Sequence, residues 1–325
     1  MSDASYTMGI DLGGTKMFAV VFDADFEVVG SSRAPTVGHE GPQAGLERIG
    51  GCIDEALADA GLKGSELIAA GIGCPGVVDF ETGVLRHAPN LGWNEVEVGK
   101  FLDDRFHCPV AVLNDVDAGT YGEYHHGAGK GARSLLGVFP GTGVGGGFIY
   151  EGKILRGRRA SCLEIGNIRL LGSSLEGATG EPVRLEALAS RLNIASTCAA
   201  EAYRGNAPTI MERAGTDIQK IKSGVVRKAI DNGDEAVENI MKRSIEYLAL
   251  GIAAAVDLLG PDIIVLGGGL VEKMPDLYKR GVRRTIAKNA SPALVEDLEI
   301  RIAEMGDFAV AVGAAAYAVE HGTQL

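Results

Sequence analysis

The chain contains the same strand plan twice, and this internal repeat restricts its fold more than any other feature of the sequence. Each copy has an apolar strand, a glycine-rich turn with a threonine, a second strand, a tight turn and a third strand. The expected strands are residues 6–11, 17–22 and 26–30 in the first copy, and 134–139, 144–150 and 154–156 in the second. The turns are Gly13-Gly14-Thr15 and Gly141-Thr142-Gly143, with Thr15 and Thr142 in matching places. We therefore predict a duplicated module with a cleft between its copies.

Strands alternate with helices along much of the remaining chain, which is typical of the α/β class. Apolar residues at helical spacing predict a helix over residues 43–60 that ends at Gly61, and the chain is mostly helical from 185 to 259. A length of 325 residues suggests two domains. We expect a small domain of residues 1–117 completed by a C-terminal helix at about 308–325, and a large domain of residues 118–307.

Charge and composition exclude several classes of protein. The formal net charge is −12, and Lys and Arg form no cluster, which argues against a surface for nucleic acid or anionic membranes. No apolar stretch is long enough for a transmembrane helix, and no signal peptide is evident at the start. The five cysteines are scattered without a CxxC pair, so we expect a reduced, cytoplasmic protein. An anionic ligand must then be held by backbone amides or by a metal ion.

Familiar nucleotide-binding patterns occur but do not fit their context. Residues 147–154 match GxxxxGK, yet Ile154 stands where a hydroxyl should bind Mg²⁺. Residues 71–76 and 141–146 match GxGxxG, but strand-like residues follow each, where a Rossmann unit requires a helix. We therefore reject a P-loop and keep a dinucleotide fold only as a weaker alternative.

The glycine turns themselves are candidates for binding phosphate. Glycine without a Cβ lets consecutive N–H groups point at phosphate oxygens, and a threonine hydroxyl adds a donor. Asp11 precedes Gly13, Gly14, Thr15 and Lys16, where its carboxylate would orient water on a Mg²⁺ that bridges phosphates. One such turn alone would be read as an ordinary hairpin. Two copies together with Asp11 favour phosphate binding.

Asn114 and Asp115 lie where a strand ends and a helix begins, at the edge of the sheet where open α/β folds bind ligands. Phosphoryl transfer to an alcohol requires a carboxylate that accepts the hydroxyl proton, and Asp115 is our candidate. On its own, Asp115 is interpreted equally well as the N-cap of the helix. Glu164 and Glu186, taken alone, are more simply solvated carboxylates.

Taken in order, eight motifs give the chain a resemblance to the ROK family of sugar kinases, repressors and related proteins, over essentially its whole length. The motifs are DLGGTK (11–16), GCPGVVD (73–79), APNLGWN (88–94), LNDVDA (113–118), GTGVGGGF (141–148), EIGN (164–167), LEALAS (185–190) and LGGGL (266–270). The resemblance implies the duplicated actin-like ATPase fold, which is ribonuclease H-like, with two domains around a central cleft. It also implies ATP and Mg²⁺ as cofactors.

The resemblance also assigns roles to individual residues. Asp115 would be the general base. The sugar would be bound by Gly76, Asn90, Asn114, Asp115, Glu164, Asn167 and Glu186. The nucleotide phosphates would be bound by Asp11, Gly13, Gly14, Thr15 and Lys16 and by Gly141, Thr142 and Gly143, and the adenosine would lie near Gly267, Gly268 and Gly269. The repressors of the family carry a helix-turn-helix extension before the first strand, which here begins near Tyr6, so we expect no direct DNA binding.

The chain departs from the family at the residues that bind a structural zinc. Asn167 replaces a histidine of the ExGH motif, and the three zinc cysteines fall on Gly177, Thr179 and Arg184. None of these side chains supplies a thiolate or imidazole ligand. We therefore expect no structural zinc.

The resulting expectation is an ATP- and Mg²⁺-dependent hexose kinase, most simply a glucokinase that acts on the 6-hydroxyl. One alternative is a kinase for fructose, mannose or an N-acetylated amino sugar. Another is a regulatory sugar-binding protein of the same fold with weak catalysis, which the change at Asn167 makes conceivable. The resemblance favours a homodimer or homotetramer.

Overall fold

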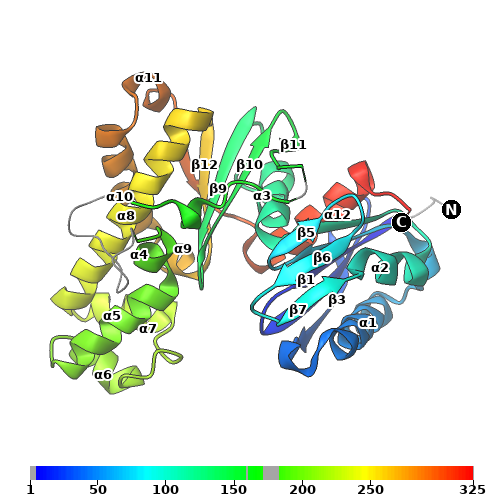
Figure 1. Cartoon of the computed structure of the whole chain (residues 1–325), viewed down its shortest axis with the longest axis horizontal. Helices are drawn as coiled ribbons and strands as arrows, with labels where there is room; N and C mark the ends of the chain where they lie inside the picture. Colours follow the sequence, from blue (N-terminus) through cyan, green and yellow to red (C-terminus); the bar gives the residue numbers. More distant parts are fainter. Residues whose placement is uncertain (1–4, 159, 171–182, 325) are drawn as a thin grey trace. The chain divides into compact units, whose positions relative to one another are not determined.

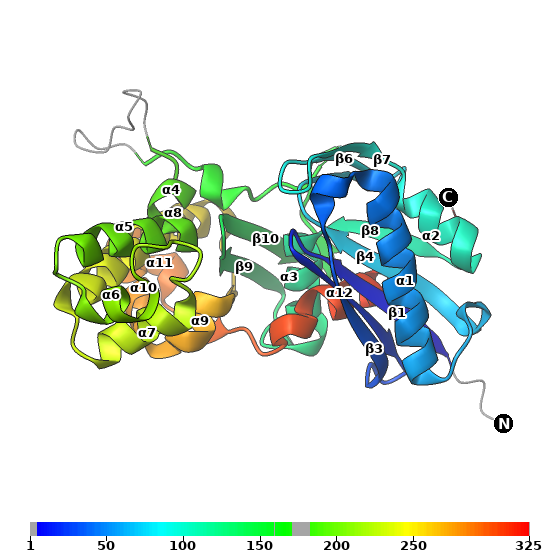
Figure 2. The same ribbon diagram turned by 90° about the horizontal axis from the view of Figure 1, so that it is seen from below.

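The computed structural model describes residues 5–158, 160–170 and 183–324, which form two compact units. The first unit comprises residues 1–131, 147–162 and 304–325, and the second comprises residues 132–146 and 163–303. Figures 1 and 2 show the elements of each unit in two views. Within the described residues, no helix combines the length and the apolarity needed to cross a membrane.

The first unit is built on a five-stranded sheet. Its strands are β1 (Tyr6–Leu12), β2 (Lys16–Phe22), β3 (Val28–Pro35), β4 (Leu67–Cys74) and β8 (Val110–Asn114), in the order β3-β2-β1-β4-β8. β1 pairs antiparallel with β2 and parallel with β4, which is itself parallel to β8. The carboxyl ends of β1, β4 and β8 therefore lie at one edge of the sheet, where ligands bind in α/β proteins.

Both faces of this sheet are covered by helices, as the nearly continuous apolar runs of its strands require. The helices of this unit are α1 (Pro42–Ala60), α2 (Val98–Phe106), α3 (Asp115–His126) and α12 (Ala309–His321), with short 3₁₀ helices η1 (Gly38–Glu40), η2 (Gly64–Glu66) and η4 (Gly306–Phe308). Side chains of β2 point alternately to the two faces of the sheet, and each face has its own apolar cluster. Met17 and Val21 pack in the cluster that contains α1, and Val20 packs against Ala311 and Val312 of α12.

Two glycines allow α12 to approach the sheet closely. A Cβ on Gly9 of β1 would overlap the carbonyl oxygen of Ala311, and a Cβ on Gly71 of β4 would overlap that of Ala314. The helix backbone therefore lies directly on the strands. This packing ties the C-terminal segment of the chain to its first strand.

A second, antiparallel sheet of three strands follows β4. It consists of β5 (Val77–Asp79), β6 (Val84–Ala88) and β7 (Trp93–Val96). Trp93 is fully buried, and its Nε1 donates to the carbonyl oxygen of Gly38 at 3.0 Å. This sheet was not predicted from the sequence, because its strands are too short to show a clear alternation.

The second unit contains a helical layer and most of a mixed five-stranded sheet, in which β12 is parallel to both β9 and β13 whereas β10 and β11 are antiparallel. The sheet order is β11-β10-β9-β12-β13, with β9 (Ser134–Pro140), β10 (Val144–Tyr150), β11 (Lys153–Ile154), β12 (Ile263–Leu266) and β13 (Glu299–Ile302). The division between the units runs within β10. The helices are α4 (Glu186–Ala189), α5 (Arg191–Tyr203), α6 (Pro208–Ala214), α7 (Ser223–Asp231), α8 (Glu235–Leu259), α9 (Gly269–Lys273), α10 (Pro275–Asn289) and α11 (Pro292–Val295), with the 3₁₀ helix η3 (Ile165–Asn167).

The 25-residue helix α8 forms the core of this helical layer. Its buried face includes Ile245, Leu248 and Ile252, at the spacing of one helical stripe. The helix ends at Gly260, which is in the left-handed conformation with φ +56°. Pro261 follows directly, so the chain turns into β12 without continuing the helix.

The division of the chain differs from the expected boundary at residue 117. Residues 118–131, 147–162 and 304–307, expected in the large domain, belong to the first unit. For residues 118–131 the reason is that α3 packs along α12. The hydroxyl of the buried Tyr121 of α3 also donates to Oε2 of the exposed Glu320 of α12 at 2.7 Å. The packing of α3 is a tertiary contact between distant segments, which local periodicity does not reveal.

Candidate functional site

The residues predicted to bind ligands divide between the two units. The first unit contains Asp11, Gly13, Gly14, Thr15, Lys16, Gly76, Asn90, Asn114 and Asp115. The second contains Gly141, Thr142, Gly143, Glu164, Asn167, Glu186, Gly267, Gly268 and Gly269. Within each unit the structure brings residues from distant motifs together.

The first glycine turn joins β1 to β2 and is held from outside the motif. Gly13 N donates to Lys16 O at 3.0 Å, and a Cβ on Gly13 would lie 2.6 Å from that same oxygen. The fully buried Thr36 donates its hydroxyl to Gly13 O at 2.7 Å and its N–H to Thr15 O at 3.0 Å. Thr36 therefore fixes the turn while Gly14 and Thr15 are exposed. No sequence pattern had singled out Thr36.

Lys16 lies at the exposed end of the same turn. Its Nζ is 3.5 Å from Asp307, which also accepts a hydrogen bond from Arg33 at 2.8 Å. The Arg33 hydrogen bond holds the pKa of Asp307 below its usual value. Lys16 of β2 and Arg33 of β3 thus flank one exposed carboxylate, and of these two cations only Lys16 was predicted.

Asp11, at the end of β1, is largely buried in the field of a second carboxylate. Burial, followed by the negative charge of Asp115, raises its pKa to about 7, while Lys16 opposes the shift. Two carboxylates that repel each other are more stable with a cation nearby. Their oxygens are the ligands that Mg²⁺ prefers, so the residues present fit a magnesium ion at this edge of the sheet.

The structure separates the roles of Asn114 and Asp115. Asn114 is the N-cap of α3, since its Oδ1 accepts from the N–H groups of Val116 at 2.9 Å and Asp117 at 3.3 Å. Its Nδ2 donates to Gly76 O at 3.0 Å. Asp115 is the first residue of the helix, and its Oδ1 accepts from Val116 N at 3.0 Å. The N-cap of α3 is therefore Asn114 and not Asp115, and the role of Asp115 as a base stays a prediction.

Gly76 lies beside Asn114, and Asn90 lies beside Gly14 of the first glycine turn. Gly76 has φ +95°, and a Cβ there would overlap the carbonyl oxygen of His87, so the loop after β4 requires glycine. Asn90 follows β6, and its Cβ would lie 3.6 Å from a Cβ placed on Gly14. The loop after β4, the turn after β6 and the first glycine turn are therefore neighbours.

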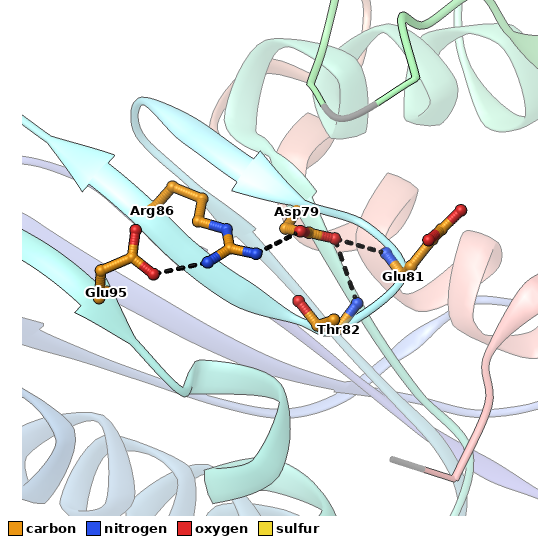
Figure 3. Close-up of polar contacts among 5 residues, drawn as sticks. All are labelled: Asp79, Glu81, Thr82, Arg86 and Glu95. Carbon is orange, nitrogen blue, oxygen red and sulfur yellow. Dashed lines mark hydrogen bonds and ion pairs between the residues drawn. The ribbon is translucent and has the colours of Figure 1, made fainter.

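An ion-pair network holds the small sheet that carries this loop (Figure 3). Arg86 donates to Asp79 at 2.7 Å and to Glu95 at 2.6 Å, joining β5, β6 and β7. Asp79 also accepts from the N–H groups of Glu81 and Thr82, which closes the turn between β5 and β6. The hydrogen bond from Arg86 is the main reason that the pKa of Asp79 is lowered. The network fixes the sheet on which Gly76 and Asn90 depend.

The second glycine turn joins β9 to β10. Gly141 N donates to Gly143 O at 2.9 Å, and Gly141 O accepts from Arg191 N at 2.8 Å. The Arg191 side chain donates to the Thr142 hydroxyl at 3.2 Å. A Cβ on Gly143 would lie 2.9 Å from Glu186 Oε2, so glycine leaves room for that carboxylate. Arg191, the first residue of α5, was not predicted from the sequence.

Glu164 is exposed and Glu186 is partly exposed, and the charge of Glu186 acts on Glu164. Partial burial raises the pKa of Glu164, and the negative charge of Glu186 adds to the effect. Asn167 donates from Nδ2 to Glu164 Oε2 at 3.4 Å and accepts at Oδ1 from Arg184 at 3.2 Å. Gly177 and Thr179, two of the positions that the resemblance assigns to zinc, lie outside the described residues.

The glycine triplet after β12 has a packing role of its own. A Cβ on Gly267 would lie 2.7 Å from the ring of Phe139, and Gly268 has φ +91° with a Cβ position 3.1 Å from Pro140 O. Gly269 begins α9. The fold thus requires glycine at 267 and 268, and a role of the triplet in adenosine binding stays a prediction.

A profile of the ROK family matches residues 7–321. The chain belongs to the ROK family. A glucokinase from Halalkalibacterium halodurans is 31% identical over 319 residues, covering 96% of this chain and 94% of the relative. A putative xylose repressor from Caldicellulosiruptor is 25% identical, covering 96% of this chain and 77% of the repressor. The family therefore connects this chain with kinases and with regulators.

A solved structure supports the same assignment and establishes the fold. The ROK family glucokinase from Streptomyces griseus, in complex with glucose and AMPPNP, has a TM-score of 0.81 and 26% identity, over 97% of this chain and 99% of that one. The predicted fold class is thus confirmed as the duplicated actin-like ATPase fold. Its two related halves explain why the same strand plan occurs twice.

Proposed function

We propose that this ROK protein phosphorylates a hexose with ATP, and that glucose is converted to glucose 6-phosphate. The kinase relatives and the glucokinase structure bound to glucose and AMPPNP support this proposal. The single observation in this chain that carries it is the position of Asp115. That residue directly follows β8, its charge acts on Asp11, and it lies on a helix that Asn114 already caps.

In the proposed reaction, Asp115 acts as the general base. Its carboxylate accepts the proton of the sugar 6-hydroxyl while that oxygen bonds to the γ-phosphorus of ATP, and the bond to the β-phosphate oxygen breaks to release ADP. Asp11 would hold Mg²⁺ through water, and a magnesium ion supplies positive charge to the phosphate oxygens. The glycine turns, with Thr15, Lys16 and Thr142, donate to the phosphates.

Sugar recognition is proposed for six residues besides Asp115. They are Gly76, Asn90 and Asn114 in the first unit, and Glu164, Asn167 and Glu186 in the second. A carboxylate accepts from sugar hydroxyls, and an amide both donates and accepts. Part of the hydrogen-bonding capacity of the Asn114 side chain is already used within the protein, because its Oδ1 caps α3 and its Nδ2 donates one hydrogen to Gly76 O.

A coupled assay of ADP release over a hexose panel tests the proposal. Glucose, fructose, mannose, N-acetylglucosamine and N-acetylmannosamine are compared at saturating ATP and Mg²⁺. We expect the highest kcat/KM for glucose. A higher value for another sugar would identify the chain as a kinase for that sugar.

A regulatory sugar-binding protein is the second candidate, and the similarity to a xylose repressor supports it. This second candidate predicts sugar binding by calorimetry without ADP release.

For either function we propose a cytoplasmic protein that forms a homodimer or homotetramer. Light scattering of the purified protein measures the oligomeric state. We also propose that neither nucleic acid nor membrane is a partner.

A further inference from the structure

We propose that Arg184 is a positioning residue that orients the Glu164 carboxylate through Asn167, in a span that other members of the family close with zinc. The inference deepens the proposed function, because it rests on Glu164 as a sugar ligand. It concerns contacts within the second unit only. Arg184 and Asn167 are the last and first of the four positions that the resemblance assigns to zinc, and here they contact each other directly.

The side-chain contacts form a directional relay. Arg184 Nη1 donates to Asn167 Oδ1 at 3.2 Å, which leaves the Nδ2 side of that amide facing Glu164. Nδ2 then donates to Glu164 Oε2 at 3.4 Å, a long hydrogen bond. Because a guanidinium only donates, it fixes which end of the amide it faces. The opposite amide orientation would place two oxygens against each other at Glu164.

The backbone anchors both ends of the relay. Residues 168–170 run antiparallel to residues 183–185, with Leu185 N donating to Ile168 O at 2.8 Å and Leu170 N to Val183 O at 3.2 Å. Leu185 is fully buried, and a Cβ on Gly251 of α8 would overlap its side chain. Arg184 therefore starts from a fixed point even though its guanidinium is exposed.

Glu164 is the carboxylate that the relay orients. The residue is exposed, and desolvation together with the negative charge of Glu186 raises its pKa. Asn167 Nδ2 is a donor that faces this carboxylate. A cationic guanidinium and a neutral amide are not ligands for zinc, and we derive no role for that metal here.

The test compares Arg184→Ala, Arg184→Lys and Asn167→Ala with Arg213→Ala, an exposed arginine of α6 in the same unit. Glucose binding is measured by calorimetry without nucleotide, and KM is measured separately for glucose and for ATP. For Arg184→Ala we expect the glucose Kd and KM to rise about tenfold, as for loss of a charged hydrogen bond. The KM for ATP should stay within about twofold of wild type.

Two further comparisons separate positioning from general destabilisation. Arg184→Lys, which keeps the charge and a donor, should recover part of the glucose affinity. The double variant of Arg184→Ala and Asn167→Ala should bind glucose no more weakly than Asn167→Ala alone, since both break one relay. Arg213→Ala should bind like wild type.

The inference is overturned if Arg184→Ala binds glucose within about twofold of wild type, or if the two single effects add. One equivalent of tightly bound zinc in the wild type would also overturn it. Failure of the proposed function has a different signature. In that case the wild type itself neither binds nor phosphorylates any hexose of the panel, and the inference fails with it.

Discussion

Replacing Asp11 by Asn should make the protein more stable, and the gain should depend on pH. The pKa of Asp11 is raised from 3.8 to about 7 in the folded protein by burial and by the charge of Asp115. Below pH 4 the carboxyl is protonated in both states and contributes nothing. Between pH 4 and 7 the folded state keeps a proton that the unfolded state has lost, so stability decreases as the pH rises. Above pH 7 the penalty is constant.

The size of the effect follows from the shift. About three pKa units at roughly 1.4 kcal/mol each correspond to a penalty on the order of 4 kcal/mol above pH 7. About half of it develops between pH 5.5 and 8, because at pH 5.5 the unfolded state has already lost its proton. We therefore expect the stability gain of Asp11→Asn to grow by about 2 kcal/mol over that range.

Urea unfolding followed by tryptophan fluorescence measures this difference. Trp93 is the only tryptophan of the chain and is buried in the same unit as Asp11, so its signal reports the relevant transition. Asp307→Asn is the matched control of opposite sign. The pKa of Asp307 is lowered by Arg33, so this carboxylate stabilises the fold at neutral pH and loses the effect on acidification.

A gain for Asp11→Asn that is the same at pH 5.5 and pH 8 would refute the reasoning, and so would a loss of stability at pH 8. Added Mg²⁺ should reduce the gain, because an ion bound to the ionised wild-type carboxylate offsets its penalty. Activity should be lost in the variant at every pH. The ionised carboxylate of Asp11 therefore lowers the stability of the fold, and the same negative charge allows it to bind a cation.

Three other predictions concern single features of the fold. Asp115→Asn should lower kcat by about 10² to 10⁴ with little change in Tm, and a near-normal kcat would contradict its role as the base. Elemental analysis should find no stoichiometric zinc and a chelator should not unfold the protein, whereas activity should still require added Mg²⁺. Glu123→Gln should lower the free energy of unfolding by about 2 to 4 kcal/mol in urea titrations. The fully buried carboxylate accepts from the N–H groups of Ala128, Glu304 and Met305, and the amide of a glutamine would turn a donor toward these donors. An unchanged unfolding midpoint would contradict this prediction.

The family and the fold class were predictable because their signals are local in the chain. Strand periodicity and the glycine turns produced the duplicated plan, and the order of eight short motifs identified the family. The sequence pattern also predicted that Asp11 and Asp115 lie where β1 and β8 end. Parallel strands of one sheet end at the same edge, so the pattern also predicts that these two residues lie at one edge of the sheet.

Which residue caps α3 could be decided only from the structure, and the role of Asp115 as a base stays a prediction. Both residues at the start of α3 can cap a helix, and only the three-dimensional arrangement shows that Asn114 does so. The same holds for Thr36, whose hydrogen bonds to the first glycine turn join residues far apart in sequence. Sequence periodicity contains no information on which distant side chain reaches a turn.

Asn167 and Arg184 illustrate both what the sequence determines and what only the structure determines. The sequence alone determined that zinc ligands are missing, because Asn and Arg side chains cannot replace imidazole and thiolate. Only the tertiary structure decided what Asn167 and Arg184 do instead, since their contact depends on two antiparallel segments whose pairing is set by the buried Leu185 and by its packing against α8. Side-chain chemistry is local to a residue, whereas the partner of that side chain is chosen by the packing of the whole unit.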